Sequence, residues 1–531
     1  MVAQTTAPTP PPNDPNDLVP SLGNHNNIFS IYWKTSDREG HYSQYRMNTT
    51  SWNNQSAGHY GDVSNFQYAS NAAVYKNASG LAGLNWLFKN NAQVGFVEFN
   101  YKKVGNTNYV WQNMKKGSGD YGSGNESLTI NTLNTKGDLN FEVKLGGTSN
   151  ITTLNNEAER LNMKVDNENN DRLNITTLNQ NTTGISQIFK NVSVDTFNLY
   201  AGRSYQRGGT VTNLNIQGGS FYQGYKDNLT PSEHDGTIET ITLQDGIFQQ
   251  GKGSVTTLNQ SGGGAKQEGG SITNLNLSGG TFTHNGGTLS NVVLKAGGSG
   301  STFVNGTNSA FANITQEGGN HTIIGKVAKF TLASGSFTNN GSIETLTTNT
   351  TTRALRNAQA ATTNHITNNG TIDKLELTKD ATSVTNNAVY NTGGGLASGI
   401  IKELDVKSGN ATINTLNGVG QGTAANVEPH TLSNIKITAN SAKLTVDTLS
   451  VGLKGNQAME RVTINNNTGN SGGKKEFAVN KIQVTYIDGT FDPAKSISKN
   501  LKDYVSSNTI SQSYVDQSSK PTFESSPELQ G

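Results

Sequence analysis

The chain has 531 residues, and its 40 Lys and Arg against 39 Asp and Glu leave a formal net charge of +1. This balance argues against a nucleic-acid or anionic-membrane partner, because either would call for a basic surface. The absence of cysteine excludes disulfides, thiolate catalysis and cysteine-ligated zinc, and it suits a chain that crosses an outer membrane unfolded.

Residues 1–23 hold six of the eleven prolines, so we expect an extended, disordered leader there. No window of the sequence holds the roughly 18 to 20 continuous apolar residues of a transmembrane helix. No signal peptide is recognisable, and the residues after Met1 are typical of a mature exported N-terminus with a start methionine added. We therefore expect an exported chain without a transmembrane segment.

Residues 24–126 are rich in aromatic side chains and contain all four tryptophans. The apolar run from Gln93 to Tyr101 predicts a buried strand within this region. A stacked solenoid needs its first coil covered, because an open end exposes apolar side chains and unpaired strand edges. We therefore predict an N-terminal cap region, and aromatic residues that present a ligand surface are the alternative.

A degenerate repeat occupies residues 127–469. Its unit, visible in GTVTNLNIQGGSF and GSITNLNLSGGTF, pairs a β-branched or leucine residue with a Leu-x-Leu pair before a Gly-rich corner. Alternation as in Leu275 and Leu277 fits a half-buried strand, and the recurring glycines break any helix. Five of the steps between successive leading apolar positions are 16 or 17 residues long. These positions are Val194, Val211, Ile238, Val255, Ile272, Leu289, Val327, Ile343 and Ile372.

These features predict an all-β chain folded as a parallel β-helix, a solenoid with coils of about 17 to 20 residues. Ladders of Asn and Thr side chains are expected to help join the coils. Phenylalanines ten positions after the leading residues are expected to stack along the coils, namely Phe221, Phe248, Phe282 and Phe337. The repeat degrades after about residue 395, and residues 470–531 are predicted to form a C-terminal cap and linker.

The Thr-x-Leu-x-Leu-x-Gly-Gly-x-Phe coils, the Asn richness, the absence of cysteine and the Pro-rich start resemble the passenger domains of bacterial type V autotransporters. Among these, the chain is most similar to the vacuolating-cytotoxin-like "toxin-like outer membrane" autotransporters of Helicobacter. The resemblance covers residues 127–460 and implies a right-handed β-helix, display on the bacterial surface or secretion, and a role in host colonisation. The C-terminal translocator barrel of that family has no counterpart in the sequence, which suggests a passenger or a fragment of one.

Carbohydrate-active β-helices carry carboxylates at matched positions on neighbouring coils. No constant offset relates the acids of the repeat, namely Asp195, Glu239, Asp245, Asp373, Glu376 and Asp405. The densest acidic segment, residues 157–172, is interpreted as a solvated loop, with a catalytic cluster as the alternative. The eight histidines lack metal-ligand spacing, and no phosphate-binding or nucleophile motif is present. We therefore predict no enzyme activity, no metal site and no cofactor.

Tyrosines and basic residues gather in two neighbouring segments of the repeat. Tyr205 and Tyr222 are 17 residues apart, which is one coil, so they are expected to lie side by side. Such exposed patches are typical of surfaces that bind proteins or sugars, and a tyrosine stack that covers the coil edge is the alternative. The candidate binding residues are Tyr200, Arg203, Tyr205, Arg207, Tyr222, Tyr225 and Lys226.

The sequence therefore favours an adhesin or host-interaction factor that presents loops on a rigid β-helix to a host cell-surface protein or glycan. One alternative is an oligomeric, membrane-active toxin-like protein, but residues 1–40 lack the small-residue apolar stretch that it would need. The other alternative is a carbohydrate-active β-helix enzyme. The expected location is the bacterial outer-membrane surface or the secreted fraction, and the oligomeric state stays open.

Overall fold

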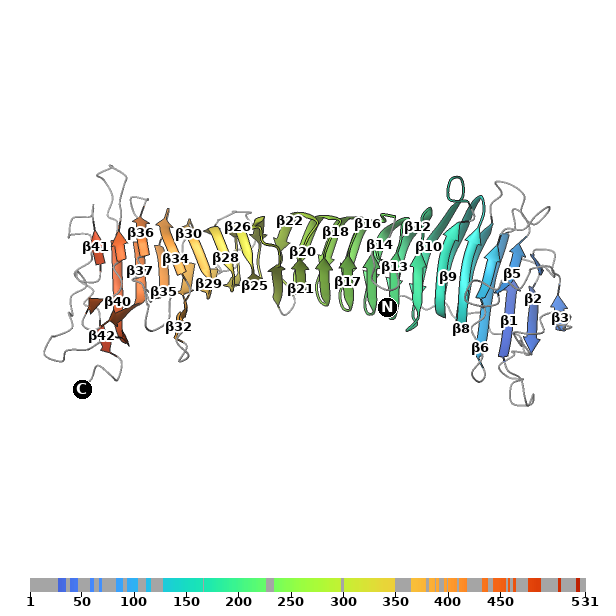
Figure 1. Ribbon diagram of the computed structural model, residues 1–531, viewed down its shortest axis with the longest axis horizontal. Helices are drawn as coiled ribbons and strands as arrows, with labels where there is room; N and C mark the ends of the chain where they lie inside the picture. Colours follow the sequence, from blue (N-terminus) through green and yellow to red (C-terminus); the bar gives the residue numbers. More distant parts are fainter. Residues whose placement is uncertain are drawn as a thin grey trace, which may run out of the picture. The chain divides into compact units, whose positions relative to one another are not determined.

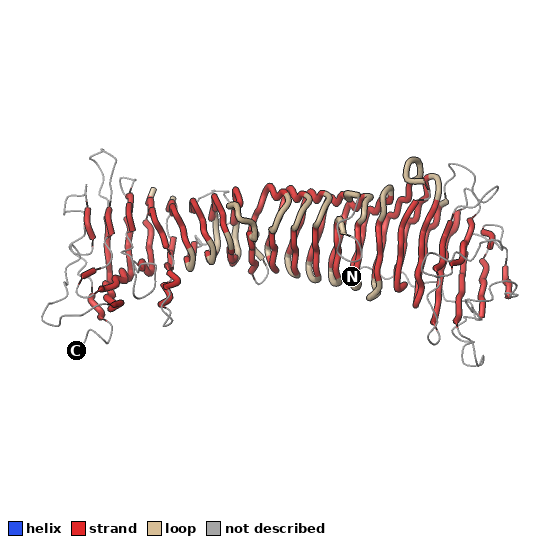
Figure 2. The backbone as a smooth tube through the Cα atoms, in the orientation of Figure 1, coloured by secondary structure: helices blue, strands red, loops and turns tan. Residues whose placement is uncertain are grey.

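The structure is a computed structural model. It describes residues 27–34, 39–45, 58–61, 66–68, 83–88, 93–103, 111–115, 128–165, 167–225, 234–297, 300–348, 364–378, 382–386, 388–390, 396–398, 400–407, 410–417, 432–437, 443–454, 457–458, 462–464, 476–488, 505–507 and 522–525. The regular elements in these ranges are strands, and Figure 2 shows no helix among them. Thus no described segment is a helix that is long and apolar enough to cross a membrane.

The chain divides into two compact units. Unit 1 comprises Met1–Leu258 and Gln267–Ile272, and unit 2 comprises Asn259–Lys266 and Thr273–Gly531. The strands around the division are β18 (Ser254–Gln260), β19 (Gly264–Gln267) and β20 (Ser271–Leu277).

Unit 1 begins with antiparallel pairs and continues as parallel coils (Figure 1). Its strands are β1 (Asn27–Lys34), β2 (Glu39–Tyr45), β3 (Gly58–Gly61), β4 (Phe66–Tyr68), β5 (Gly83–Phe88), β6 (Gln93–Lys103), β7 (Trp111–Lys115), β8 (Thr129–Leu145), β9 (Thr148–Val165), β10 (Arg172–Gln180), β11 (Ile185–Ile188), β12 (Val192–Leu199), β13 (Arg203–Gln206), β14 (Thr210–Ile216), β15 (Ser220–Gln223), β16 (Thr237–Leu243) and β17 (Ile247–Gln250). β1 pairs antiparallel with both β2 and β6. The pairs β2–β3 and β4–β5 are also antiparallel.

Two parallel ladders follow in unit 1. The first joins β6, the N-terminal parts of β8 and β9, and then β10, β12, β14 and β16. The second joins β5, β7, the C-terminal parts of β8 and β9, and then β11, β13, β15 and β17. Each coil therefore contributes one strand, or one strand half, to each ladder.

Unit 2 repeats this arrangement. Its strands are β21 (Gly279–His284), β22 (Thr288–Leu294), β23 (Gly300–Asn305), β24 (Phe311–Gln316), β25 (Asn320–Ile324), β26 (Lys326–Leu332), β27 (Ser336–Asn339), β28 (Ser342–Thr348), β29 (Asn364–Asn368), β30 (Thr371–Leu377), β31 (Thr382–Asn386), β32 (Ala388–Tyr390), β33 (Leu396–Ser398), β34 (Ile400–Val406), β35 (Asn410–Asn417), β36 (Leu432–Ile437), β37 (Lys443–Lys454), β38 (Gln457–Ala458), β39 (Val462–Ile464), β40 (Glu476–Asp488), β41 (Val505–Ser507) and β42 (Thr522–Ser525).

The parallel ladders of unit 2 also number two. One runs from β22 through β24, β26, β28, β30, β34, β36 and β39 to β41. The other runs from β21 through β23, β25, β27, β29, β31, β35, β37 and β40 to β42. Strands β32 and β33 form a separate antiparallel pair.

The predicted all-β parallel β-helix is confirmed. All nine leading apolar positions are buried, with exposed fractions between 0% and 9%. Parallel pairing extends past both predicted limits of the repeat, beginning at β5 and β6 and continuing to β42. The predicted leader, residues 1–23, lies outside the described residues. The right-handed sense stays a prediction from the resemblance.

The predicted phenylalanine stack occurs as two separate pairs. Phe221 stacks on Phe248 with ring centroids 6.4 Å apart, and Phe282 stacks on Phe303, which the sequence reading missed, at 6.0 Å. The expectation of a continuous stack through Phe337 is wrong, because Phe337 lies in register with His321. In that coil the apolar position next to Phe303 is Ile323, two residues further along β25.

Side-chain amides join the coils on the outer face and at the corners. On the outer face of unit 1, successive bonds of 2.9 Å link a ladder of Asn134, Asn155, Asn179, Asn198 and Asn215, as the predicted ladders require. At the corners, buried glutamines reach two coils at once. Gln206 donates through Nε2 to the carbonyl oxygens of Gly209 at 3.2 Å and Thr237 at 3.0 Å. Such bonds satisfy buried backbone carbonyl groups that the turn leaves without a partner.

Candidate functional site

The predicted tyrosines and arginines lie on the outer face of the second ladder of unit 1. In β13, Ser204 and Gln206 are buried in the core, so the intervening side chain of Tyr205 points outward. Register pairs Tyr205 with Tyr222 and Arg203 with Ser220 on the next strand, β15. We name the set Phe189, Arg203, Tyr205, Arg207 and Tyr222 the tyrosine–arginine surface.

Tyr205 and Tyr222 stack, as their spacing predicted. Their ring centroids are 5.0 Å apart and their planes differ by 16°. The expectation that both are exposed is wrong for Tyr205, which is 1% exposed although it points outward. Tyr222 is half-buried and keeps part of its surface open to solvent. The pair therefore combines the two alternatives, because one ring packs against the coil and the other remains available for contact.

Tyr225 has a structural setting. It is 5% exposed, and its hydroxyl group donates to Glu268 Oε2 at 2.6 Å. Burial raises the pKa of Tyr225, and the hydrogen bond and charge of Glu268 raise it further. Its ring lies over Gly251, where an added Cβ atom would come within 2.7 Å of the ring. Tyr225 therefore depends on a glycine one coil away. The expectation that it is exposed is wrong, and its role in binding stays a prediction.

Phe189 belongs to the surface although no sequence pattern predicted it. Arg207 Cζ lies 5.2 Å from the centroid of its ring, and Lys164 Nζ lies 4.6 Å from the same centroid. Lys164 is also 3.1 Å from Glu142 Oε2, so its charge is partly neutralised. Contacts of this kind contribute about 0.5–1 kcal/mol at exposed sites. The available signal in the sequence would have been Phe189 itself, an aromatic residue directly after β11.

The candidates that remain are Arg203, Tyr200 and Lys226. Arg203 is exposed on the tyrosine–arginine surface, whereas Tyr200 is 43% exposed in the turn after β12 and is not part of this sheet face. Lys226 lies outside the described residues. The structure thus brings together Arg203, Tyr205, Arg207 and Tyr222. Aromatic rings beside guanidinium groups can stack on a sugar or pack against a protein partner.

The acidic segment is the predicted solvated loop only in part, because Glu168 lies in an exposed turn at residues 167–170 whereas other acids do not. Glu157 and Glu159 lie within β9, an 18-residue strand. Asp171 is 3% exposed, and its carboxylate accepts from the backbone N–H groups of Gly147 and Asn167 at 2.8 Å each. Asp171 therefore holds the turn between β9 and β10, and Asp166 lies outside the described residues.

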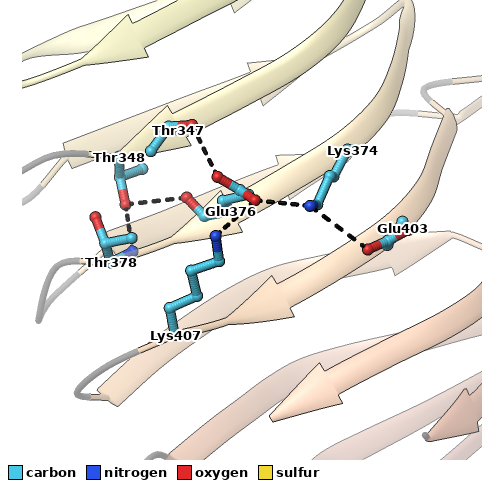
Figure 3. A network of polar contacts seen from close by, with 7 residues as sticks. All are labelled: Thr347, Thr348, Lys374, Glu376, Thr378, Glu403 and Lys407. Carbon is cyan, nitrogen blue, oxygen red and sulfur yellow. Dashed lines mark hydrogen bonds and ion pairs between the residues drawn. The ribbon is translucent and has the colours of Figure 1, made fainter. Parts of the chain in front are cut away.

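A second polar cluster lies on the outer face of unit 2 (Figure 3). Glu376 Oε1 is 2.7 Å from both Lys374 Nζ and Lys407 Nζ, and Thr347 donates to its Oε2 at 3.2 Å. Burial raises the pKa of Glu376, but the hydrogen bonds and charges of the two lysines outweigh burial and lower that pKa to about 2. Glu376 is therefore ionised at neutral pH and ill suited to donate a proton.

The expectation that the acids of the repeat do not stack is wrong for Glu376 and Asp405. These residues are register partners on β30 and β34, one coil apart. The 29-residue separation hid the pairing, because the coil between them is longer than the 16- or 17-residue standard. Lys374 and Glu403 are register partners on the same two strands, with Nζ and Oε1 3.9 Å apart.

No group of three or more His, Cys, Asp or Glu side chains in the described part of the chain could hold a metal ion. No family model matches the chain, no curated protein is significantly similar in sequence, and no solved structure is significantly similar in fold.

Proposed function

We propose that the chain is a secreted or surface-displayed passenger of the autotransporter type and that it acts as an adhesin. The tyrosine–arginine surface carries this proposal, because the exposed Arg203 shares a strand face with Tyr205, on which the half-buried ring of Tyr222 is held by stacking. Side chains held in place before binding lose less conformational entropy on contact, which favours affinity. The parallel β-helix supports the proposal as a scaffold that repeats short strands and leaves their outer faces available.

The ionised state of Glu376, the carboxylate in register with Asp405, favours binding over catalysis as the function. Glu376 is engaged by two lysines and a threonine, and its lowered pKa makes it a weak base as well as an unsuitable acid. We therefore propose no enzyme activity for this cluster, and its ion pairs are assigned to joining β28, β30 and β34.

The proposal is tested with the double variant Arg203→Ala and Tyr222→Ala. Loss of an aromatic and an arginine contact at an interface is expected to weaken saturable binding to host epithelial cells about tenfold or more. Binding of the fluorescently labelled chain is measured by flow cytometry, and circular dichroism checks that the fold is retained. Tyr200→Ala is the matched control, because Tyr200 is exposed but off this surface. Equal binding by the double variant and wild type would remove the tyrosine–arginine surface from the function.

A further inference from the structure

A row of five threonines crosses the outer face of unit 2. Register pairing places Thr281, Thr302, Thr322, Thr338 and Thr367 beside one another on β21, β23, β25, β27 and β29. Thr302, Thr322, Thr338 and Thr367 each lie between two buried residues of their strands, and Thr281 precedes the buried Phe282, so these side chains point outward. Adjacent parallel strands lie about 4.8 Å apart, so the row offers hydroxyl groups at that repeat.

The threonine row lines a groove of about 540 Å³. Gly280 and Gly300 line the same groove without side chains, while Asn320 and Ser336 add polar groups. None of the five threonine hydroxyl groups has a hydrogen-bond partner among the residues that the structure describes. The groove therefore presents donors and acceptors that are free to bind a ligand.

The groove carries no charged side chain. Its lining contains no Asp, Glu, Lys or Arg, and its one titratable residue, His321, is 3% exposed. His321 Nε2 lies 2.7 Å from the carbonyl oxygen of Gly318, so this nitrogen donates, and Nδ1 accepts from the Ser301 hydroxyl at 2.6 Å. Burial lowers the pKa of His321, which keeps the ring neutral. An anionic ligand would find no ion-pair partner in this lining.

Two apolar side chains lie beside the threonine row. Val304 and Ile324 are register partners two residues beyond Thr302 and Thr322, on the same outer face. Ile324 is 39% exposed, which is unusual for a large aliphatic side chain. The face thus places two adjacent aliphatic side chains beside a row of hydroxyl groups. A ligand that matches it has hydroxyl groups along one edge and C–H groups on its face.

We propose that this threonine groove binds a neutral oligosaccharide chain laid across the strands, with sugar hydroxyl groups on the threonine row and a pyranose face on Val304 and Ile324. The strand repeat is comparable to the length of one sugar unit, so successive units meet successive threonines. The inference rests on the proposed adhesin function and supplies its ligand class.

The test uses the full chain and immobilised oligosaccharides in two matched sets, one neutral and one with the same backbones sulfated or sialylated. Wild type is expected to bind the neutral set. The double variant Thr302→Val and Thr322→Val keeps shape but removes two hydroxyl groups, and about tenfold weaker binding is expected. Thr302→Ser with Thr322→Ser should retain most of the binding. The control variant Thr315→Val with Thr331→Val, a register pair on the other ladder, should bind as wild type.

Equal binding by the Thr302→Val and Thr322→Val variant, or binding of the charged set alone, would overturn the groove assignment. Failure to bind any oligosaccharide in either set would overturn it as well. Cell binding separates this failure from failure of the adhesin proposal. If wild type binds cells but no oligosaccharide, and if the valine substitutions leave cell binding unchanged, the adhesin function stands and the groove is excluded. If wild type binds the neutral set but not cells, the groove stands and the adhesin function is excluded.

Discussion

Glu376 is ionised although burial opposes its charge. Two lysines at 2.7 Å and a threonine hydroxyl at 3.2 Å supply hydrogen bonds to both of its oxygens. A carboxylate whose pKa is lowered on folding stabilises the folded chain above the pKa of the unfolded form, and that stabilisation is lost as the pH falls through the folded pKa. The relevant interval here runs from 4.5 down to about 2.

Substitution of Glu376 by Gln is therefore expected to destabilise unit 2 by about 1–3 kcal/mol at neutral pH, because the charge-assisted bonds are lost. The difference from wild type should shrink below about pH 4.5 and vanish near pH 2. Urea unfolding at several pH values measures this difference in unfolding free energy between wild type and variant. Glu344→Gln on β28 is the control, because Glu344 is exposed and should change stability little at any pH. A wild-type-to-variant difference that stays constant with pH would contradict this account of Glu376.

Tyr205 and Tyr222 mark how far single residues can be predicted from the sequence. Their adjacency followed from the 17-residue spacing, because a solenoid places residues one period apart on neighbouring strands. Their exposure did not follow, because an outward-pointing ring can be covered by side chains from strands on either side. Phe189 was missed for the same reason, since its contacts with Lys164 and Arg207 come from two other coils.

At the scale of strands and corners, the buried glutamines are the feature that the hydrophobic pattern overlooked. The same bond recurs at corners with the spacing Gln-x-x-Gly: Gln206, Gln250, Gln260 and Gln316 each donate to the carbonyl oxygen of that glycine. Each also donates to a carbonyl group of the following coil. The glycines alone predict the corners, but the partners of their backbone groups do not follow from the apolar pattern.

We expect Gln250→Ala to destabilise unit 1 by about 2–4 kcal/mol, because it leaves buried carbonyl groups unsatisfied and opens a cavity. Gln250 is fully buried and donates to Gly253, Ser271 and the side chain of Gln223 at 3.0–3.2 Å. Hydrogen exchange at β15, β17 and their turns, together with the thermal midpoint, measures the effect. The control is Gln244→Ala, because Gln244 is exposed. Equal protection in the two variants would show that the corner bonds contribute little.

At the scale of the whole molecule, the sequence predicted the fold well because a β-helix is built from contacts between neighbouring coils. A 16- or 17-residue repeat of buried residues therefore determines both the strands and their pairing. The register of coils of other lengths does not follow from this repeat, as at Glu376 and Asp405, where 29 residues separate register partners. The threonine row was missed because its members are separated by 16 to 29 residues and no apolar pattern marks them.

The central claim is that the chain binds a host surface through the outer faces of its coils. The most direct measurement is the binding isotherm of the purified, labelled chain on host epithelial cells, with a parallel β-helix protein of unrelated function as control. The account predicts saturable binding that the unlabelled chain displaces. Binding that is absent, or that is linear and equal to the control, would contradict it.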